Sequence, residues 1–444
     1  MQREVEDKSR YAIIAAVHVP TVSDIEFEAS LNELRELAKT LGFKVVHTFI
    51  QNRSGFDTTG YLGVGKRHEI SRFVNNEPDG DDWAGMSLPG PIEAVLVDHE
   101  ISPSQARNLE LDVGCEVMDR TMVILEIFHR NARSRAARAQ VEIARLGYMA
   151  PRLREAAKLA GPQGRQRSGA GGRGGGESHT ELDRRKIRDR IAELQMEIDA
   201  MEVERKTQRS RRQERQGLAG VALVGYTNAG KSTLMRALTG SEVLVANKLF
   251  ATLDTTVRTL YPESVPRVLV SDTVGFIKNL PHGLVASFKS TLDEALDAAL
   301  LLHVIDASDP GFERQITVTE KVIEEIDAGK VPRLRIFNKI DQVGDAKAQA
   351  ERAKALRAQF PKCIVMSAVD MDAVAKLRKS IRAFFSRRLV KAELFLPWSA
   401  QHLRGELFAN CVVLEERADA EGAFFHVRGE RADIDGLREK IKIA

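Results

Sequence analysis

The residues of this sequence that are best suited to chemistry lie in the stretch Gly225–Ser232, which reads G-x-x-x-x-G-K-S. Glycines at its first and sixth positions allow a loop to curl until its backbone N–H groups point at phosphate oxygens. In this pattern Lys231 reaches the outer phosphates and the Ser232 hydroxyl binds Mg²⁺. The predicted nucleotide contacts are Gly225, Tyr226, Thr227, Asn228, Ala229, Gly230, Lys231 and Ser232.

The segments on either side of this loop give it the context that a phosphate site needs. Val221–Val224 is apolar and partly β-branched, which predicts a buried strand. Thr233–Leu238 has the composition of a helix, whose N-terminus would add its dipole to the anion site. A chance glycine-rich turn is the alternative, and the motifs that follow argue against it.

Two further segments are typical of a nucleotide-dependent switch. A threonine-rich stretch can close a hydroxyl onto Mg²⁺ when a γ-phosphate is present, and either Thr252 or Thr256 is suited to this. Its predicted contacts are Phe250, Ala251, Thr252, Leu253 and Asp254. An apolar strand then leads into a D-x-x-G sequence, whose Asp lies near the metal and whose Gly N–H contacts the γ-phosphate. These residues are Asp272, Thr273, Val274 and Gly275.

The base that this site would recognise is indicated by an N-K-x-D sequence at another strand end, formed by Asn338, Lys339, Ile340 and Asp341. The Asp341 carboxylate can accept hydrogen bonds from both N1–H and the 2-amino group of guanine, a pattern that adenine does not offer. Lys339 can lie along the base, and Asn338 can tie two loops together. Main-chain N–H groups at Ser367, Ala368 and Val369 would back the guanine. Guanine is therefore favoured over adenine.

The residue after D-x-x-G bears on the mechanism of hydrolysis. Ras-type GTPases carry a Gln there to orient the attacking water, whereas this chain has Phe276. No catalytic residue can be assigned, and we expect slow hydrolysis until a partner completes the site. Asn228, within the phosphate loop, is a candidate ligand for a monovalent cation such as K⁺.

Composition and charge restrict the class of protein. The chain has 444 residues, of which 43% are hydrophobic and 29% charged, typical of a globular protein with several domains. The sequence has no long apolar run and a charged beginning, so we expect a cytoplasmic protein without a membrane span. We also expect a monomer. Its three scattered cysteines suggest neither disulfides nor a zinc site.

The rest of the sequence predicts the elements that would carry this site. Residues 1–120 alternate strand and helix patterns, which indicates a parallel-sheet α/β domain; Asp98, His99 and Glu100 are expected in a surface loop. Residues 121–217 contain two helical stripes, one from Leu125 to about Pro151 and one from about Glu181, which predict an antiparallel hairpin. Residues 218–388 would form a P-loop domain with a parallel sheet flanked by helices, and 389–444 a small α+β domain.

The hairpin carries a strong local charge. Between Arg133 and Arg173 there are ten Arg and Lys residues and two acids, a net charge of +8. Such an excess suggests a polyanionic partner, although a solvated helix face is the alternative. A Gly/Arg-rich tip loop, with Arg165, Arg167 and Arg173, is suited to contacts with RNA phosphates.

Several of these segments together resemble the HflX family of translational GTPases over about residues 10–390. The resemblance rests on Asn228–Ser232, Phe250–Asp254, Asp272–Phe276, Ser102–Gln105 and Asp119–Thr121. The Gly-rich stretch Gly172–Glu177 is also similar to the family's connector, whereas Thr255 stands where the family usually has Pro.

This resemblance implies a GTPase that binds the large ribosomal subunit and splits stalled or idle ribosomes under stress, with hydrolysis to GDP allowing release. By similarity, Ser232 and Thr252 would hold Mg²⁺, with Thr256 as the alternative switch threonine. An RNA-remodelling NTPase and a GTP-dependent regulatory adaptor that do not act on the ribosome are the competing hypotheses.

Overall fold

The protein is described by a computed structural model that covers residues 10–77, 88–159, 179–216, 219–240, 249–250, 256–264, 267–278, 295–387 and 389–443. The chain folds into two compact units. One is formed mainly by residues up to Asp199, and the other mainly by residues from Ala200 onwards. In the described part of the chain, no helix is long and apolar enough to cross a membrane.

The N-terminal domain contains a four-stranded, fully parallel sheet in the order β2-β1-β3-β4. Helices α2 and α3 contribute to the core on one face, while α1 and α4 contact each other and the sheet elsewhere. The strands are β1 (Arg10–His18), β2 (Phe43–Asn52), β3 (Ile92–Val97) and β4 (Glu116–Asp119). The helices are α1 (Asp24–Thr40), α2 (Val64–Val74), α3 (Pro103–Val113) and α4 (Arg120–Asn131). Helix α3 begins with a capping box, which Ser102 and Gln105 form.

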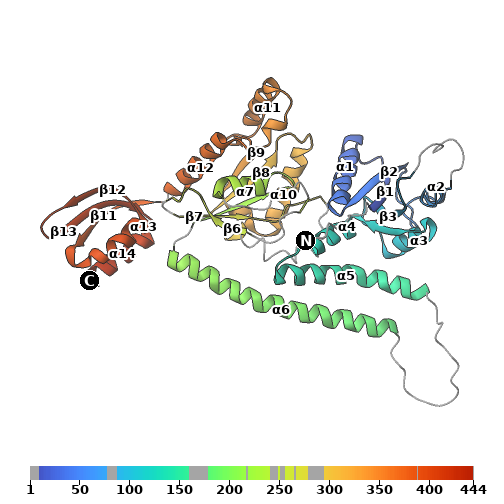
Figure 1. Cartoon of the computed structure of the whole chain (residues 1–444), viewed down its shortest axis with the longest axis horizontal. Coiled ribbons are helices and arrows are strands. Elements are labelled where there is room, and N and C mark those ends of the chain that lie inside the picture. Colours follow the sequence, from blue (N-terminus) through green and yellow to red (C-terminus); the bar gives the residue numbers. More distant parts are fainter. Residues whose placement is uncertain are drawn as a thin grey trace, which may run out of the picture. The chain divides into compact units, whose positions relative to one another are not determined.

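The helical arm consists of α5 (Arg135–Leu159) and α6 (His179–Gln216). Two ion pairs, Arg190–Glu142 and Arg135–Glu197, show that the helices run antiparallel, as predicted, and Figure 1 shows them side by side. The predicted apolar stripe of α6 is confirmed, since Leu194 and Ile198 are buried in it. The predicted RNA contacts Arg165, Arg167 and Arg173 lie outside the described residues.

One sequence prediction about the arm is wrong. The first stripe is not a single helix from Leu125, because α4 ends at Asn131 and α5 begins at Arg135. Ser134 caps the second helix, its Oγ accepting a hydrogen bond from the N–H of Ala137 at 3.1 Å. The helix then continues past Pro151 to Leu159.

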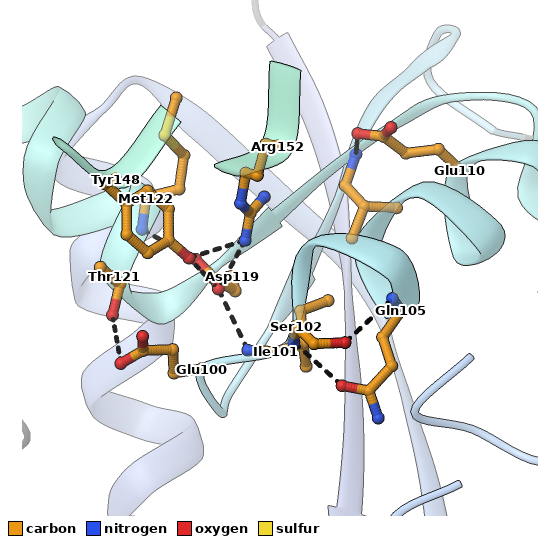
Figure 2. Close-up of polar contacts among 11 residues, drawn as sticks. Glu100, Ile101, Ser102, Gln105, Glu110, Asp119, Thr121, Met122, Tyr148 and Arg152 are labelled. Atoms are coloured by element: carbon orange, nitrogen blue, oxygen red, sulfur yellow. Dashed lines mark hydrogen bonds and ion pairs between the residues drawn. The ribbon is translucent and has the colours of Figure 1, made fainter. Parts of the chain in front are cut away.

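A buried carboxylate, that of Asp119 at the end of β4, links the first arm helix to the N-terminal sheet (Figure 2). Its oxygens accept hydrogen bonds from the N–H groups of Ile101 and Met122, at 3.2 and 2.9 Å. From α5, Arg152 Nη2 approaches at 2.7 Å and the Tyr148 hydroxyl also donates to this carboxylate. Burial and the charge of Asp119 raise the pKa of Tyr148, so its hydroxyl stays protonated and can donate.

The surface loop predicted at Asp98, His99 and Glu100 is confirmed in part: the three residues follow β3 in a loop, in which Glu100 is exposed and His99 half-buried, but Asp98 is buried. Asp98 is buried and pairs with the buried Arg120 at 3.0 Å, because a charge at this depth needs a partner. His99 Nδ1 lies 2.8 Å from the Tyr61 hydroxyl, and Glu100 accepts a hydrogen bond from Thr121. The three side chains serve different partners and form no common site.

The nucleotide-binding domain has a six-stranded sheet in the order β10-β9-β8-β5-β7-β6, in which only the edge strand β6 runs antiparallel. Its strands are β5 (Ala219–Gly225), β6 (Thr256–Thr259), β7 (Val268–Asp272), β8 (Leu300–Asp306), β9 (Arg333–Asn338) and β10 (Ile364–Val365). Its described helices are α7 (Lys231–Thr239), α10 (Phe312–Glu325), α11 (Ala346–Gln359) and α12 (Met371–Ser386), with short 3₁₀ turns at Ala328–Lys330 and Ile340–Gln342. The P-loop fold expected from the sequence is confirmed.

The C-terminal domain is the small α+β domain that was predicted, with an antiparallel sheet in the order β11-β13-β12. Its strands are β11 (Val390–Pro397), β12 (Cys411–Ala418) and β13 (Gly422–Gly429). A 3₁₀ helix (Trp398–Leu403), α13 (Arg404–Asn410) and α14 (Arg431–Ile443) complete its core.

Candidate nucleotide-binding site

Four of the predicted motifs lie at or just beyond the carboxyl ends of parallel strands in the nucleotide-binding domain. The phosphate loop follows β5, D-x-x-G follows β7, N-K-x-D follows β9 and the Ser367 loop follows β10. Ligands of open α/β sheets bind at this edge, because the loops from several strands meet there. Segments up to 142 residues apart in the chain are thereby brought to one edge of the sheet.

The backbone of the phosphate loop adopts the strained geometry that its sequence allows. Gly230 has φ +91°, and a Cβ there would lie 2.3 Å from Asn338 Nδ2. Asn228 also has a positive φ of 58°, which Asn tolerates better than most residues. Close approach of N-K-x-D to the loop therefore requires glycine at position 230.

Asn338 joins the loops around the site, as the sequence predicted. Its side chain is buried, and its Nδ2 donates to the carbonyl of Ala229 at 2.9 Å. Its Oδ1 accepts from the N–H of Ala368 at 2.8 Å. Three loops are thus linked by one amide. The next residue, Lys339, has φ +60° and pairs with Asp306 at 2.8 Å, while Asp341 is exposed and accessible to a base.

The residues suited to Mg²⁺ are adjacent in the structure. Ser232 Oγ donates to Asp272 Oδ2 at 2.8 Å, and Asp272 is completely buried. A hydroxyl and a carboxylate are oxygen ligands of the kind that Mg²⁺ prefers, and substrate phosphates and water usually supply the remainder. This pair therefore fits the magnesium ion that GTPases of this fold use. The predicted ligand Thr252 lies outside the described residues, and Thr256 is the first residue of β6.

Phe276, which stands where Ras-type GTPases have Gln, also connects D-x-x-G to the phosphate loop through its backbone. Its side chain is buried, its carbonyl accepts from Thr227 N–H at 2.7 Å, and its N–H donates to Gly225 at 3.1 Å. The Tyr226 hydroxyl accepts from the N–H of Lys278 at 2.8 Å. The residues that follow D-x-x-G, from Phe276 to Lys278, are therefore hydrogen-bonded to the phosphate loop. A buried phenyl group cannot orient water, which is consistent with the expectation of slow hydrolysis.

Lys231 is buried among backbone carbonyls, with its Nζ 3.0 Å from Gly225 O and 2.8 Å from Tyr226 O. Burial lowers its pKa to about 8, and nearby Asp272 opposes this shift only in part. Nucleotide phosphates would stabilise the ammonium group and raise this pKa again.

A pH dependence of nucleotide affinity follows from this lowered pKa. Above pH 8 the free protein loses the Lys231 proton that the complex retains, so binding takes up a proton. We expect GDP affinity to be constant below about pH 7 and to fall by about fivefold between pH 8 and 9, measured with a fluorescent GDP. In Lys231→Arg, whose guanidinium stays charged, this slope should disappear even if binding is weaker. A flat wild-type profile to pH 9 would contradict the assignment.

Comparison with known proteins is consistent with this site. Residues 28–129 match a family described as GTP-binding GTPase N-terminal, and 131–212 match GTP-binding GTPase Middle Region. Residues 220–339 match the family 50S ribosome-binding GTPase.

Two relatives that match over most of their length have the same name. The chain is 48% identical to GTPase HflX of Gluconacetobacter diazotrophicus, covering 97% of both chains. It is 36% identical to GTPase HflX of Escherichia coli, covering 92% of this chain and 91% of the relative. Among solved structures, a GTP-binding protein of Sulfolobus solfataricus in complex with GDP is 22% identical, with a TM-score of 0.44 over 84% of this chain and 99% of the other.

Proposed function

The chain belongs to the HflX family of GTPases, and we propose that it acts on the large ribosomal subunit. It is a GTP hydrolase whose domain carries the phosphate loop, the Mg²⁺ pair and the guanine-reading loop described above. In the proposed function, GTP-bound protein binds the subunit and separates stalled or idle ribosomes, and hydrolysis to GDP permits release.

The observation that carries this proposal is the combination of a guanine-nucleotide site with a long basic arm on one chain. Helices α5 and α6 form a paired arm, and the segment Arg133–Arg173 has a net charge of +8. Ribosomal RNA is a polyanion that such an arm can contact through its phosphates. The matched family named for 50S ribosome binding supports the same partner. Arg165, Arg167 and Arg173 at the tip are proposed RNA contacts.

In the proposed mechanism, the ribosome supplies part of the catalytic site. The chain's own residues hold the phosphates, orient the base and bring Ser232 and Asp272 together; bound Mg²⁺ supplies charge stabilisation at the phosphates. Phe276 supplies no group that could orient water. We propose that contact with the large subunit completes the site, with Asn228 binding K⁺ as an additional cofactor, and that the protein works in the cytoplasm as a monomer.

Stimulation of turnover by purified large subunits tests the proposal. Groups supplied by a partner can raise GTPase rates by about 10³–10⁵-fold, and we expect stimulation in this range with large but not small subunits. The stimulation should weaken steeply with salt, because phosphate contacts release counterions. A variant lacking residues 161–176 should keep its basal rate and lose most of the stimulation. Stimulation by naked RNA together with ATP use would favour an RNA-remodelling NTPase, and no stimulation at all would favour an adaptor.

A further inference from the structure

The lysine of N-K-x-D is held by an acid from the neighbouring strand. Lys339 Nζ lies 2.8 Å from Asp306 Oδ2, and the two side chains are only 17% and 14% exposed. Asp306 is the last residue of β8 and is paired in the sheet with Asn338, which directly precedes Lys339. The ion pair therefore joins the ends of two adjacent strands at the edge of the sheet where the nucleotide site lies.

The backbone on both sides of Lys339 is also held. Lys339 has a φ of +60°, in the left-handed region that residues other than glycine rarely adopt. Before it, the carbonyl of Asn338 accepts a hydrogen bond from the N–H of Ala307 at 2.8 Å. After it, the N–H of Ile340 donates to the carbonyl of Met366 at 3.4 Å. These bonds fix the direction in which the Lys339 side chain leaves the backbone.

The stem of Lys339 lies beside the phosphate loop. A Cβ on Gly230 would be 4.0 Å from Lys339 Cε, which is van der Waals contact. A lysine has a long, flexible stem and an end that water solvates strongly, so without a partner it would sample many rotamers. Asp306 holds it in one conformation, next to the loop that binds the phosphates.

Asp306 is itself held by the turn that follows β8. Its Oδ1 accepts hydrogen bonds from the backbone N–H of Ser308 at 2.9 Å and from the Ser308 hydroxyl at 2.6 Å. Its Oδ2 is the oxygen that faces Lys339. The two oxygens therefore have different partners, and a substitution can disturb the contact with the lysine while it preserves the turn.

We propose that Asp306 is a positioning residue for guanine nucleotides: before the nucleotide binds, it holds Lys339 in the conformation in which the lysine lies along the base. A side chain that must be ordered during binding weakens a complex, so a lysine that is already ordered gives tighter binding. GTP and GDP share the base, so the effect is the same for both. The inference concerns nucleotide binding by the chain alone and does not depend on the ribosome.

The test measures nucleotide affinity and dissociation rate in the full chain without ribosomes. In Asp306→Asn, the amide oxygen can keep both hydrogen bonds with Ser308, while the NH₂ group faces the ammonium group of Lys339. We expect GDP and a non-hydrolysable GTP analogue to bind about threefold to tenfold more weakly, through faster dissociation. In a Lys339→Met background, which has no ammonium group to hold, the same substitution should change either affinity by less than about twofold.

Inosine diphosphate, which lacks the 2-amino group of guanine, shows whether the base-reading loop keeps its conformation. Asp341 is the residue predicted to accept a hydrogen bond from that group, so the wild-type protein should prefer GDP. Asp306→Asn should lower both affinities by the same factor and leave this preference unchanged. Loss of the preference would mean that Asp306 stabilises the loop as a whole, and the proposal would be wrong.

Asp309→Asn is the matched control for the loss of charge. Asp309 lies in the same turn, where its oxygens accept from the N–H of Gly311 and from Gln315 Nε2, both at 2.7 Å. Lys339 keeps its partner in this variant, so nucleotides should bind normally. Unchanged affinity in Asp306→Asn, an equal loss in Asp309→Asn, or an undiminished loss in the Lys339→Met background would each overturn the proposal. Stimulation of the wild-type protein by large subunits is a separate measurement, so its failure would bear only on the proposed function.

Discussion

Replacement of Asp341 by Asn is expected to lower the affinity for GTP by about 10⁴-fold, because the guanine donors would then face an amide donor. The structure places Asp341 in the 3₁₀ turn after β9, exposed and next to Lys339, which is held by Asp306. The Asn side chain should instead accept xanthine, which has a carbonyl where guanine has its amino group. We therefore expect binding of xanthosine triphosphate to rise as GTP binding falls, measured by calorimetry with both nucleotides.

Asp345→Asn is the control for this prediction. Asp345 is also exposed, and it caps α11 by accepting from the N–H of Ala348 at 2.8 Å. Asn caps helices as well as Asp does, so this variant should bind GTP normally. If Asp341→Asn retains GTP affinity within about tenfold, Asp341 does not read the base and the assignment of guanine specificity to N-K-x-D is wrong.

The nucleotide site was predictable because its motifs are short and act largely through local backbone geometry. Glycines, a lysine and a serine within eight residues define the loop, and apolar runs before each motif predict the parallel strands. Strand ends of a parallel sheet meet at one edge, so the convergence of Asn338 with the phosphate loop could also be expected. The buried Phe276 was recognised as unsuited to water activation, but its hydrogen bonds to Gly225 and Thr227 were not.

Contacts between distant side chains could not be predicted in the same way. Asn131 Nδ2 donates to the carbonyl of Phe250, which is 119 residues away in the chain, and neither residue type indicates the other. The helix break at Ala132 is hard to predict because small residues continue the helical period through it. Asn131 and Ser134, both common at helix ends, are the signal that the sequence offers. The burial of Asp98 could not be predicted from its neighbours in the sequence, because its buried partner Arg120 lies 22 residues further along the chain.

Such long-range contacts stabilise the fold, and Asp119 makes several of them. We expect its replacement to lower the stability of the protein more than the other substitutions described above. In Asp119→Ala, Arg152, Tyr148 and two backbone N–H groups would lose their common acceptor inside the protein. Removal of one partner from a buried ion pair lowers the free energy of unfolding by about 3–5 kcal/mol, because the remaining charge stays desolvated. Hydrogen exchange of peptides from β4, α4 and the Tyr148 region of α5 should therefore accelerate by about 10²–10³-fold or more. Exchange in the nucleotide-binding sheet should not change.

Two milder variants separate the charge of Asp119 from its hydrogen bonds. Tyr148→Phe removes the hydroxyl group that donates to the carboxylate and should lower the free energy of unfolding by about 1 kcal/mol. Asp119→Asn keeps the shape of the side chain and one acceptor oxygen but removes the negative charge opposite Arg152, so its effect should lie between the other two. If all three variants exchange at the wild-type rate, the carboxylate does not hold α5 to the sheet. If the accelerated exchange extends to α6 up to Asp199, the paired helices of the arm depend on this attachment as one cooperative unit.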